Sequence, residues 1–252
     1  MRIENSFIPV EGVGETTERR LWEAGVTTWD DFDGDVVSDR KADRIFEFVD
    51  TARDRLRAVD ARYFRDTFPS GTHWRCYEDF RGETCFLDIE TTGLDQRRDD
   101  VTVVSCHRGG ETTTLVADRD LSADRLQREL DAANLLVTFN GKRFDVPFLE
   151  TSFDVSVDAP HVDLMYPCRK LGLTGGLKTI EREVGIDRDR PDLSGEDAVR
   201  LWREYQRGDE RALETLVSYN RDDTVNMRTL MELVANRLEP DPLASATTTS
   251  ER

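Results

Sequence analysis

Lysine is almost absent from this 252-residue chain. Only four of its 35 basic residues are lysines, at positions 41, 142, 170 and 178, and the others are arginines. The 52 acidic residues leave a formal net charge of −17. Many aspartates and few lysines resemble halophilic proteins, which work in molar salt, where the Debye length falls to about 3 Å. On this interpretation the acidity does not exclude a nucleic-acid partner; the alternative is an ordinary acidic protein that avoids polyanions.

Cysteine and histidine are also scarce, and they are scattered. The cysteines (76, 85, 106 and 168) form no C-x-x-C pair, and the histidines lie at 73, 107 and 161. A structural zinc site needs clustered ligands, so the sequence disfavours one. The N-terminal MRIENSFIPV lacks the apolar stretch of a signal peptide, and no run reaches the roughly 18 apolar residues of a membrane span. We expect a cytoplasmic protein with reduced thiols and no membrane contact.

Three regions of the chain differ in composition. Residues 1–78 are charged and helix-forming, which predicts a small helical N-terminal region. Residues 79–238 mix strand and helix patterns and predict the main domain. Residues 239–252, EPDPLASATTTSER, are polar and small, which is typical of a disordered tail.

The main region carries its patterns in a definite order. TCFLDIE indicates a buried strand, and the β-branched runs DVTVVSCHR and ETTTLVAD, separated by two glycines, indicate a hairpin. SADRLQRELDAA predicts a helix with Ser122 as its N-cap, followed by a strand in NLLVTFN. A short helix in VPFLETSF after Pro147, a strand end in HVDLMY and three further helices complete the pattern. The order predicts an α/β fold, a mixed sheet with helices packed on it.

The stretch CFLDIETTGL (residues 85–94) places two carboxylates in an otherwise apolar strand. Side chains alternate along a strand, so Asp88 and Glu90 point to the same face. Two unpaired carboxylates there repel each other and are costly to desolvate. Divalent metal ions would relieve that repulsion, and hard cations prefer oxygen ligands of this kind.

Two other segments carry carboxylates that could join this pair. In LLVTFNGKRFDVPFL a strand enters a turn at Asn140 and reaches Asp145, which alone is equally well explained as the cap of the next helix. In YNRDDTVNM, Tyr219 and Asp223 lie four apart and share a helix face. Asp222 lies about 100° round the helix and is the alternative to Asp223. Alone, this segment also fits a solvated acidic patch.

Taken together, these motifs resemble the DEDD exonucleases of the ribonuclease H-like fold, within the DnaQ-like 3′→5′ exonuclease superfamily. The subclass is the one with tyrosine in the third motif, and the YprB-type family is the closer match. It shares FLDIETTGL, FNGKRFDVPFL, HVDL, GLKTIEREVGI and YNRDD in this order, over about residues 75–235. The resemblance implies a mixed five-stranded sheet flanked by helices. It also implies 3′→5′ exonuclease activity with two divalent metal ions, Mg²⁺ or Mn²⁺.

The resemblance assigns roles to individual residues. It implies that Asp88 bridges both metal ions, and that Glu90 and Asp223 complete the site of the nucleophilic water. Asp145 would hold the second metal ion through water, and Tyr219 would orient the attacking water.

Further residues are expected to contact the substrate. In related exonucleases the segment after the first motif touches the terminal nucleotide through its backbone and an apolar wedge. Three of the four lysines, Lys170 among them, fall in the motif-bearing stretch, which indicates phosphate contacts. The predicted substrate-binding residues are Thr91, Thr92, Gly93, Leu94, Asn140, Lys142 and Lys178. We interpret His161 and Asp163 as structural, and Trp74 and Trp202 as core residues.

A turn of glycines precedes the first predicted helix of the N-terminal region. Gly12-Val13-Gly14 before ETTERRLWEAG resembles the helix-hairpin-helix element, in which free backbone N–H groups meet a DNA phosphate. However, few residues precede the turn, and Glu11 and Glu15 flank it. A helical cap that packs on the main domain is the alternative.

The resulting hypothesis is a metal-dependent exonuclease acting on DNA rather than RNA. A repair role fits such an enzyme, although no residue indicates one. The alternatives are an RNA exonuclease with the same chemistry, a non-catalytic nucleic-acid-binding module, and a scaffold that docks onto a helicase or polymerase partner.

Overall fold

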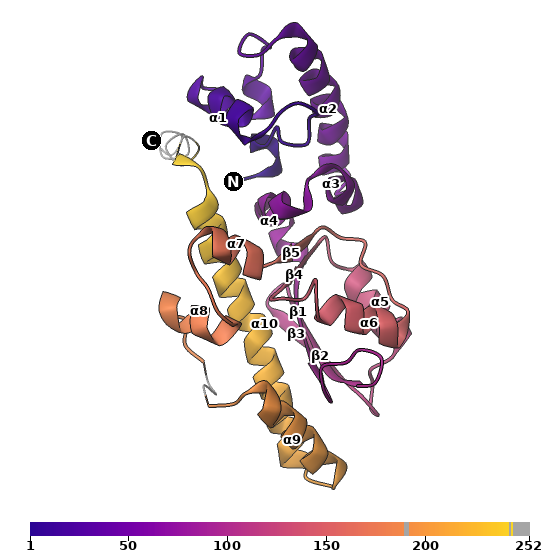
Figure 1. The fold of residues 1–252 in the computed structure, drawn as a ribbon. Coiled ribbons are helices and arrows are strands. Elements are labelled where there is room, and N and C mark those ends of the chain that lie inside the picture. The colour runs from indigo at the N-terminus through magenta and orange to yellow at the C-terminus, as the bar shows by residue number, and fades with distance from the viewer. Residues whose placement is uncertain (189–191, 242, 244–252) are drawn as a thin grey trace.

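A five-stranded mixed sheet forms the centre of the protein, and helices cover both of its faces (Figure 1). The computed structural model describes residues 1–188, 192–241 and 243. The strands are β1 (Thr84–Thr91), β2 (Val101–Arg108), β3 (Glu111–Val116), β4 (Leu135–Thr138) and β5 (His161–Asp163). They lie in the order β3-β2-β1-β4-β5, with β2 antiparallel to its neighbours and β1, β4 and β5 parallel. The mixed five-stranded sheet and its hairpin were both predicted and are confirmed.

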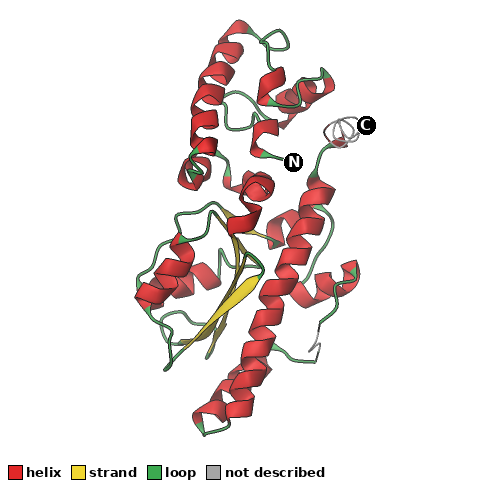
Figure 2. Cartoon of the chain, turned by 180° about the vertical axis from the view of Figure 1, so that it is seen from behind, coloured by secondary structure: helices red, strands yellow, loops and turns green. Residues whose placement is uncertain are grey.

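The helices form two layers, one on each side of the sheet. Two short helices cover one face, and the 29-residue α10 crosses the other, where three more helices surround it (Figure 2). Within the described residues, no helix has both the length and the apolar character that a bilayer span requires. The bounds are Ala123–Asp131 for α5, Asp145–Phe153 for α6, Met165–Lys170 for α7, Leu177–Val184 for α8, Gly195–Gln206 for α9 and Glu210–Leu238 for α10.

The central strand β1 divides the buried side chains into two layers, because successive residues point to opposite faces. Leu87 belongs to the apolar cluster that includes α5 and α6. Phe86 belongs to the cluster that includes α10. Asp88 and Glu90 lie two and four residues beyond Phe86, so the strand directs both carboxylates toward α10. The sheet therefore fixes the side on which a site can form.

The start of α6 overturns one alternative considered for Asp145. Phe144 occupies the N-cap position, Asp145 is the first helical residue, and no side chain caps this helix. The cap explanation for Asp145 is therefore wrong, and the helix begins two residues before Pro147 rather than after it. By contrast, Ser122 caps α5 as predicted, its side chain accepting a hydrogen bond from the Arg125 N–H.

The N-terminal region is helical, as predicted, and it packs against the sheet domain. Its buried side chains form one continuous cluster with those of β4, β5 and the C-terminal half of α10. Its elements are η1 (Ile3–Asn5), α1 (Glu15–Glu23), η2 (Trp29–Asp31), α2 (Asp39–Arg57), α3 (Ala61–Thr67), η3 (Ser70–Cys76), α4 (Tyr77–Phe80) and η4 (Arg81–Glu83).

A buried ion pair joins the two ends of this region. The Arg75 guanidinium on η3 donates to both carboxylate oxygens of Glu18 on α1, at 2.8 and 2.7 Å. Glu18 also accepts from the Ser6 hydroxyl and from the Phe7 and Ile8 N–H groups. The Glu18 side chain is 0% exposed and that of Arg75 6%, so each charge depends on the other for neutralisation.

The glycine turn before α1 differs from a helix-hairpin-helix element. Gly12 has the left-handed φ of +84° that a glycine turn requires, and Gly14 is the N-cap of α1. The residues before it form only the three-residue 3-10 helix η1, and Val13 is buried. The structure thus contains the turn and the second helix but no preceding α-helix. DNA contact there stays a prediction.

The predicted tail, residues 239–252, lies mostly outside the described residues. Of the part that is described, Glu239 pairs with the N-terminal ammonium of Met1 at 3.1 Å, and Leu243 is buried. The predicted domain boundary after residue 78 stays a prediction, since one apolar cluster extends across it.

Replacing Glu18 tests the importance of the buried pair. In Glu18→Gln the Arg75 charge stays buried without a counter-ion, so we expect the free energy of unfolding to fall by about 3 kcal/mol. Urea denaturation followed by circular dichroism measures it. Glu15→Gln, on the same helix but exposed, is the matched control and should have little effect. Equal losses in the two variants would contradict the assignment.

Candidate active site

Three carboxylates gather where β1 faces α10. The ligand atoms of Asp88, Glu90 and Asp223 all lie within 4.8 Å of one another, and within the described residues they form the one acidic group that could hold a metal ion. Asp88 is partly exposed, whereas Glu90 and Asp223 are buried. The strand contributes two residues of one face, and α10 contributes Asp223, one turn after Tyr219 on its buried side.

Asp145 is the fourth predicted carboxylate, and it lies outside this tight group. It is buried at the first position of α6, and its charge raises the pKa of Glu90, as that of Asp88 does more strongly. The Asp145 charge therefore interacts with those of Glu90 and Asp88, although Asp145 is not one of the three clustered ligands. Asp222, the alternative to Asp223, is not a member of the cluster.

The turn that carries Asp145 is held by backbone geometry and by Asp163. Asn140 adopts φ +65°, and a Cβ on Gly141 would lie 2.3 Å from the Thr138 hydroxyl, so only glycine fits this approach. The Asp163 carboxylate accepts the N–H groups of Asn140 at 2.7 Å and Lys142 at 3.1 Å. Asp163 is thus a structural anchor of the site, in agreement with its interpretation from the sequence.

Burial and mutual repulsion raise the pKa values of the clustered carboxylic acids. Desolvation raises the pKa of Asp88 to about 7, although the Asn220 amide and the Arg188 guanidinium lower it. The pKa of Glu90 and that of Asp145 are raised well above their ordinary values, first by desolvation and then by the Asp88 charge. A divalent cation would remove this repulsion. An all-oxygen donor set of this kind fits Mg²⁺ or Mn²⁺.

Arginine 188 neutralises part of the cluster in the absence of metal. Its guanidinium forms ion pairs with Asp223 and, at 2.8 Å, with Glu181 of α8; the side chains of Arg188 and Glu181 are 6% and 1% exposed. On the opposite side, the Asn220 amide donates to Asp88 at 2.7 Å. Arg188, Glu181 and Asn220 were not among the predicted site residues. Glu181 lies inside the GLKTIEREVGI motif and Asn220 inside YNRDD, whereas Arg188 lies outside all of the motifs.

The Tyr219 ring lies beside two cations, Lys178 and Arg188. The Lys178 ammonium is 4.4 Å from the ring centroid, and the Arg188 guanidinium carbon is 5.9 Å from it. Desolvation raises the pKa of the Tyr219 phenol, and the Glu90 and Asp88 charges raise it further. The hydroxyl therefore keeps its proton at neutral pH, and it can donate a hydrogen bond.

The other predicted substrate residues fall into two groups. Thr91, Thr92 and Gly93 begin a loop that is bonded to itself: the Thr91 hydroxyl donates to the Gly93 carbonyl, and Thr92 pairs with Asp100. Leu94 at its tip is 85% exposed. Of the lysines, Lys178 donates to a main-chain carbonyl of residue 193. The structure therefore leaves Leu94 free for a ligand but engages the Lys178 ammonium.

Comparisons with known proteins identify the family and the fold. A family model described as RNase_H superfamily matches residues 85–235. No curated protein matches the chain. Among solved structures, the family B DNA polymerase of the hyperthermophilic archaeon Pyrobaculum calidifontis is similar over 60% of this chain, with 19% identity and a TM-score of 0.51. The match spans 24% of the polymerase chain, and at this identity it shows the fold alone.

A second structure, NrnC of Brucella melitensis, aligns over 68% of this chain and 80% of its own length. Its identity is 19% and its TM-score is 0.46.

Replacing Arg188 tests whether it stabilises the protein as the counter-ion of buried carboxylates rather than as one more surface charge. In Arg188→Gln, Asp223 and Glu181 lose their buried partner, so the metal-free protein should lose about 3 kcal/mol of unfolding free energy. Saturating Mg²⁺ or Mn²⁺ should reduce this loss, since the cation neutralises Asp223 instead. Denaturation with EDTA and with metal measures both values. Arg182→Gln, exposed on α8, is the control; a loss at Arg188 that metal does not change would contradict the prediction.

The raised pKa of Asp88 predicts how metal-free stability depends on pH. The folded protein keeps a proton that the unfolded chain releases near pH 4, so stability falls as pH rises from about 4 to 7. In EDTA, Asp88→Asn should flatten this fall by up to about 1.4 kcal/mol per pH unit. Denaturation midpoints at pH 5, 6 and 7 measure it, with the exposed Asp124→Asn as control. Parallel curves for wild type and Asp88→Asn would exclude this role.

Proposed function

Because the chain belongs to the RNase_H superfamily, we propose that it is a metal-dependent 3′→5′ exonuclease that hydrolyses the phosphodiester bonds of DNA. The observation that carries the proposal is the group formed by Asp88, Glu90 and Asp223, with Asp145 facing it. Such a group is costly in a protein that binds no cation. The non-catalytic alternative gains no support, since every predicted carboxylate is present.

The residues that would hold the metal follow from the geometry. Asp88, Glu90 and Asp223 are close enough to share ligands, and Asp145 faces them from α6. Divalent metal ions bound there would neutralise the charge that develops on the phosphate and lower the pKa of the attacking water. Asn220 keeps one oxygen of Asp88 in a fixed direction by its 2.7 Å hydrogen bond, as partners of metal ligands generally do.

Tyr219 is placed to orient the attacking water. Its hydroxyl is protonated because its pKa is raised by burial and by Glu90 and Asp88. It can therefore donate to a water or to a phosphate oxygen beside the carboxylates. The Lys178 ammonium over its ring restricts the ring to one position.

The loop after β1 supports action at a strand end. Leu94 is a large apolar side chain with 85% exposure at the tip of a loop whose backbone is internally bonded. An exposed leucine of this kind can wedge beneath a terminal base, as the resemblance to exonucleases implied. Lys142, on the turn that leads to Asp145, supplies positive charge next to Asp163.

A digestion assay tests the proposal and the identity of the sugar together. The protein is incubated in high potassium chloride with Mg²⁺ or Mn²⁺ and a substrate labelled at its 5′ end. The substrates are single-stranded DNA, duplex DNA and RNA of matched sequence. We expect a ladder that shortens from the 3′ end of DNA. Asp88→Ala should abolish it, and Tyr219→Phe should slow it by about 10²-fold or more, the usual contribution of a group that handles a proton.

The controls separate loss of chemistry from loss of fold. Asp124→Ala, exposed on α5, should digest DNA at the wild-type rate, and circular dichroism verifies each variant. Cleavage within the strand would overturn the exonuclease assignment, and preference for RNA would overturn the choice of DNA. No cleavage by a folded, metal-binding sample would overturn the proposal as a whole.

A further inference from the structure

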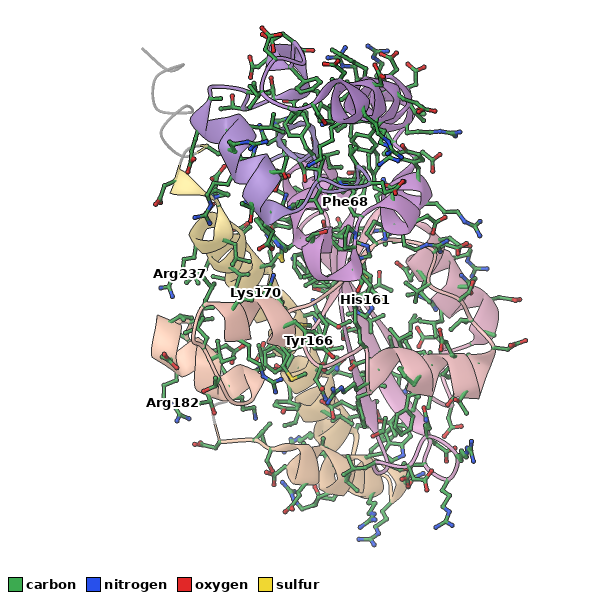
Figure 3. The ribbon with its side chains drawn as sticks, turned by 45° about the horizontal axis from the view of Figure 1, so that its top comes forward. Phe68, His161, Tyr166, Lys170, Arg182 and Arg237 are labelled. Carbon is green, nitrogen blue, oxygen red and sulfur yellow. The ribbon has the colours of Figure 1, made fainter. Side chains whose placement is uncertain are left out.

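A cavity of about 540 Å³ lies where the N-terminal region meets the edge of the sheet. Ser70, Gly71 and Trp74 of η3 form one wall, and Tyr166 and Lys170 of α7 form the other. Figure 3 shows Tyr166 and Lys170 on α7, beside His161 of β5 and below Phe68 of the N-terminal region. Residues 70–74 lie outside the part of the chain that matches the family model, so the N-terminal region supplies this wall of the cavity.

The lining combines flat apolar surface with positive charge. Trp74 and Tyr166 are aromatic; Tyr166 is 37% exposed and Trp74 is 7% exposed, so Tyr166 supplies most of the accessible ring surface. Two of the chain's four lysines, Lys142 and Lys170, line the same cavity, in a protein whose net charge is −17. This concentration of lysine is unusual for the chain, and it gives the cavity the charge that a phosphate requires.

The acidic residue in the cavity is already engaged. One Asp163 oxygen accepts the N–H groups of Asn140 and Met165, and the other accepts that of Lys142. Its hydrogen-bonding capacity is therefore largely used by the backbone, and it does not act as a ligand for an incoming cation. The Asp163 charge still interacts with Lys142, and the exposed Lys170 adds positive charge to the same cavity.

His73 fixes the η3 wall to strand β5. The His161 N–H donates to Nδ1 of His73 at 3.1 Å, and Nε2 of His73 lies 3.2 Å from the Phe68 carbonyl. Desolvation lowers the pKa of His73, so its ring is neutral and bridges η3 to β5 as a donor and an acceptor. The cavity is therefore preformed rather than created by a ligand.

One turn, residues 140–142, links the cavity to the segment that carries Asp145. Asp163 lines the cavity and also anchors residues 140–142, from which the chain reaches Asp145. A strand whose end lies at the cluster could therefore continue past Lys142 into the cavity.

We propose that this cavity binds an internal nucleotide of the substrate strand. The base lies against Trp74 and Tyr166, and the phosphate contacts Lys142 and Lys170. Ligand pockets of about 300–1,000 Å³ hold molecules of this size, and stacking on aromatic rings accepts any base. The inference rests on the proposed function for the identity of the strand, but binding at the cavity does not depend on hydrolysis.

The test measures strand binding without catalysis. A fluorescein-labelled 12-nucleotide single-stranded DNA is titrated with protein in EDTA at several concentrations of potassium chloride, and anisotropy gives Kd. For single strands each phosphate contact contributes about 0.7 to the slope of log Kd against log salt. We expect Lys170→Gln to reduce the slope by about 0.7, and Lys142→Gln combined with Lys170→Gln by about 1.4. Tyr166→Ala should raise Kd about fivefold or more at an unchanged slope.

The matched control is Arg128→Gln, because Arg128 is an exposed cation on α5 that does not line the cavity. Its slope should equal that of wild type. An unchanged slope in folded Lys170→Gln, an equal fall in Arg128→Gln, or no DNA binding by wild type would each overturn the proposal. Binding that depends on Lys170 in a protein without cleavage activity would support the cavity and overturn the nuclease assignment alone, so the two failures are distinguishable.

Discussion

Electrostatic repulsion within the carboxylate cluster is the constraint to which the neighbouring structure responds. The alternation of β1 directs Asp88 and Glu90 toward α10, and α10 then adds Asp223. The Asn220 amide donates a hydrogen bond to Asp88, and the Arg188 guanidinium forms an ion pair with Asp223. Arg188 is in turn held by Glu181 of α8. Asn220 and Arg188 thus partly compensate the carboxylate charges. Arg188 does so at Asp223, a residue that would also bind a metal ion.

The parts of the site that sequence could predict are those set by local periodicity. A two-residue period places Asp88 and Glu90 together, and a four-residue spacing places Tyr219 above Asp223, whatever the rest of the fold does. The hairpin and the Ser122 cap have equally local signals. What brings β1 to α10 is tertiary, and only the resemblance of the ordered motifs to a known family predicted it.

The features that sequence missed depend on contacts between distant segments. Arg188 is one of many arginines, and nothing in its neighbours marks it as the partner of Asp223. The same holds for Arg75, which reaches Glu18 from 57 positions away. Asp145 had a competing local explanation: its position before a helix fitted a cap, but its environment is set by burial near Asp88. The helix α7 contains a proline, so its sequence gave no periodic signal, although it supplies one wall of the cavity.

The apolar cluster that extends from the N-terminal helices into α10 has a thermodynamic consequence. Its members belong to both regions, so neither region can expose its share without opening the core of the other. The chain should therefore absorb heat in a single cooperative step, with a calorimetric enthalpy equal to the van't Hoff value. In that case a fragment lacking the first 78 residues would expose to solvent the apolar side chains of the sheet domain and α10 that the N-terminal helices normally cover.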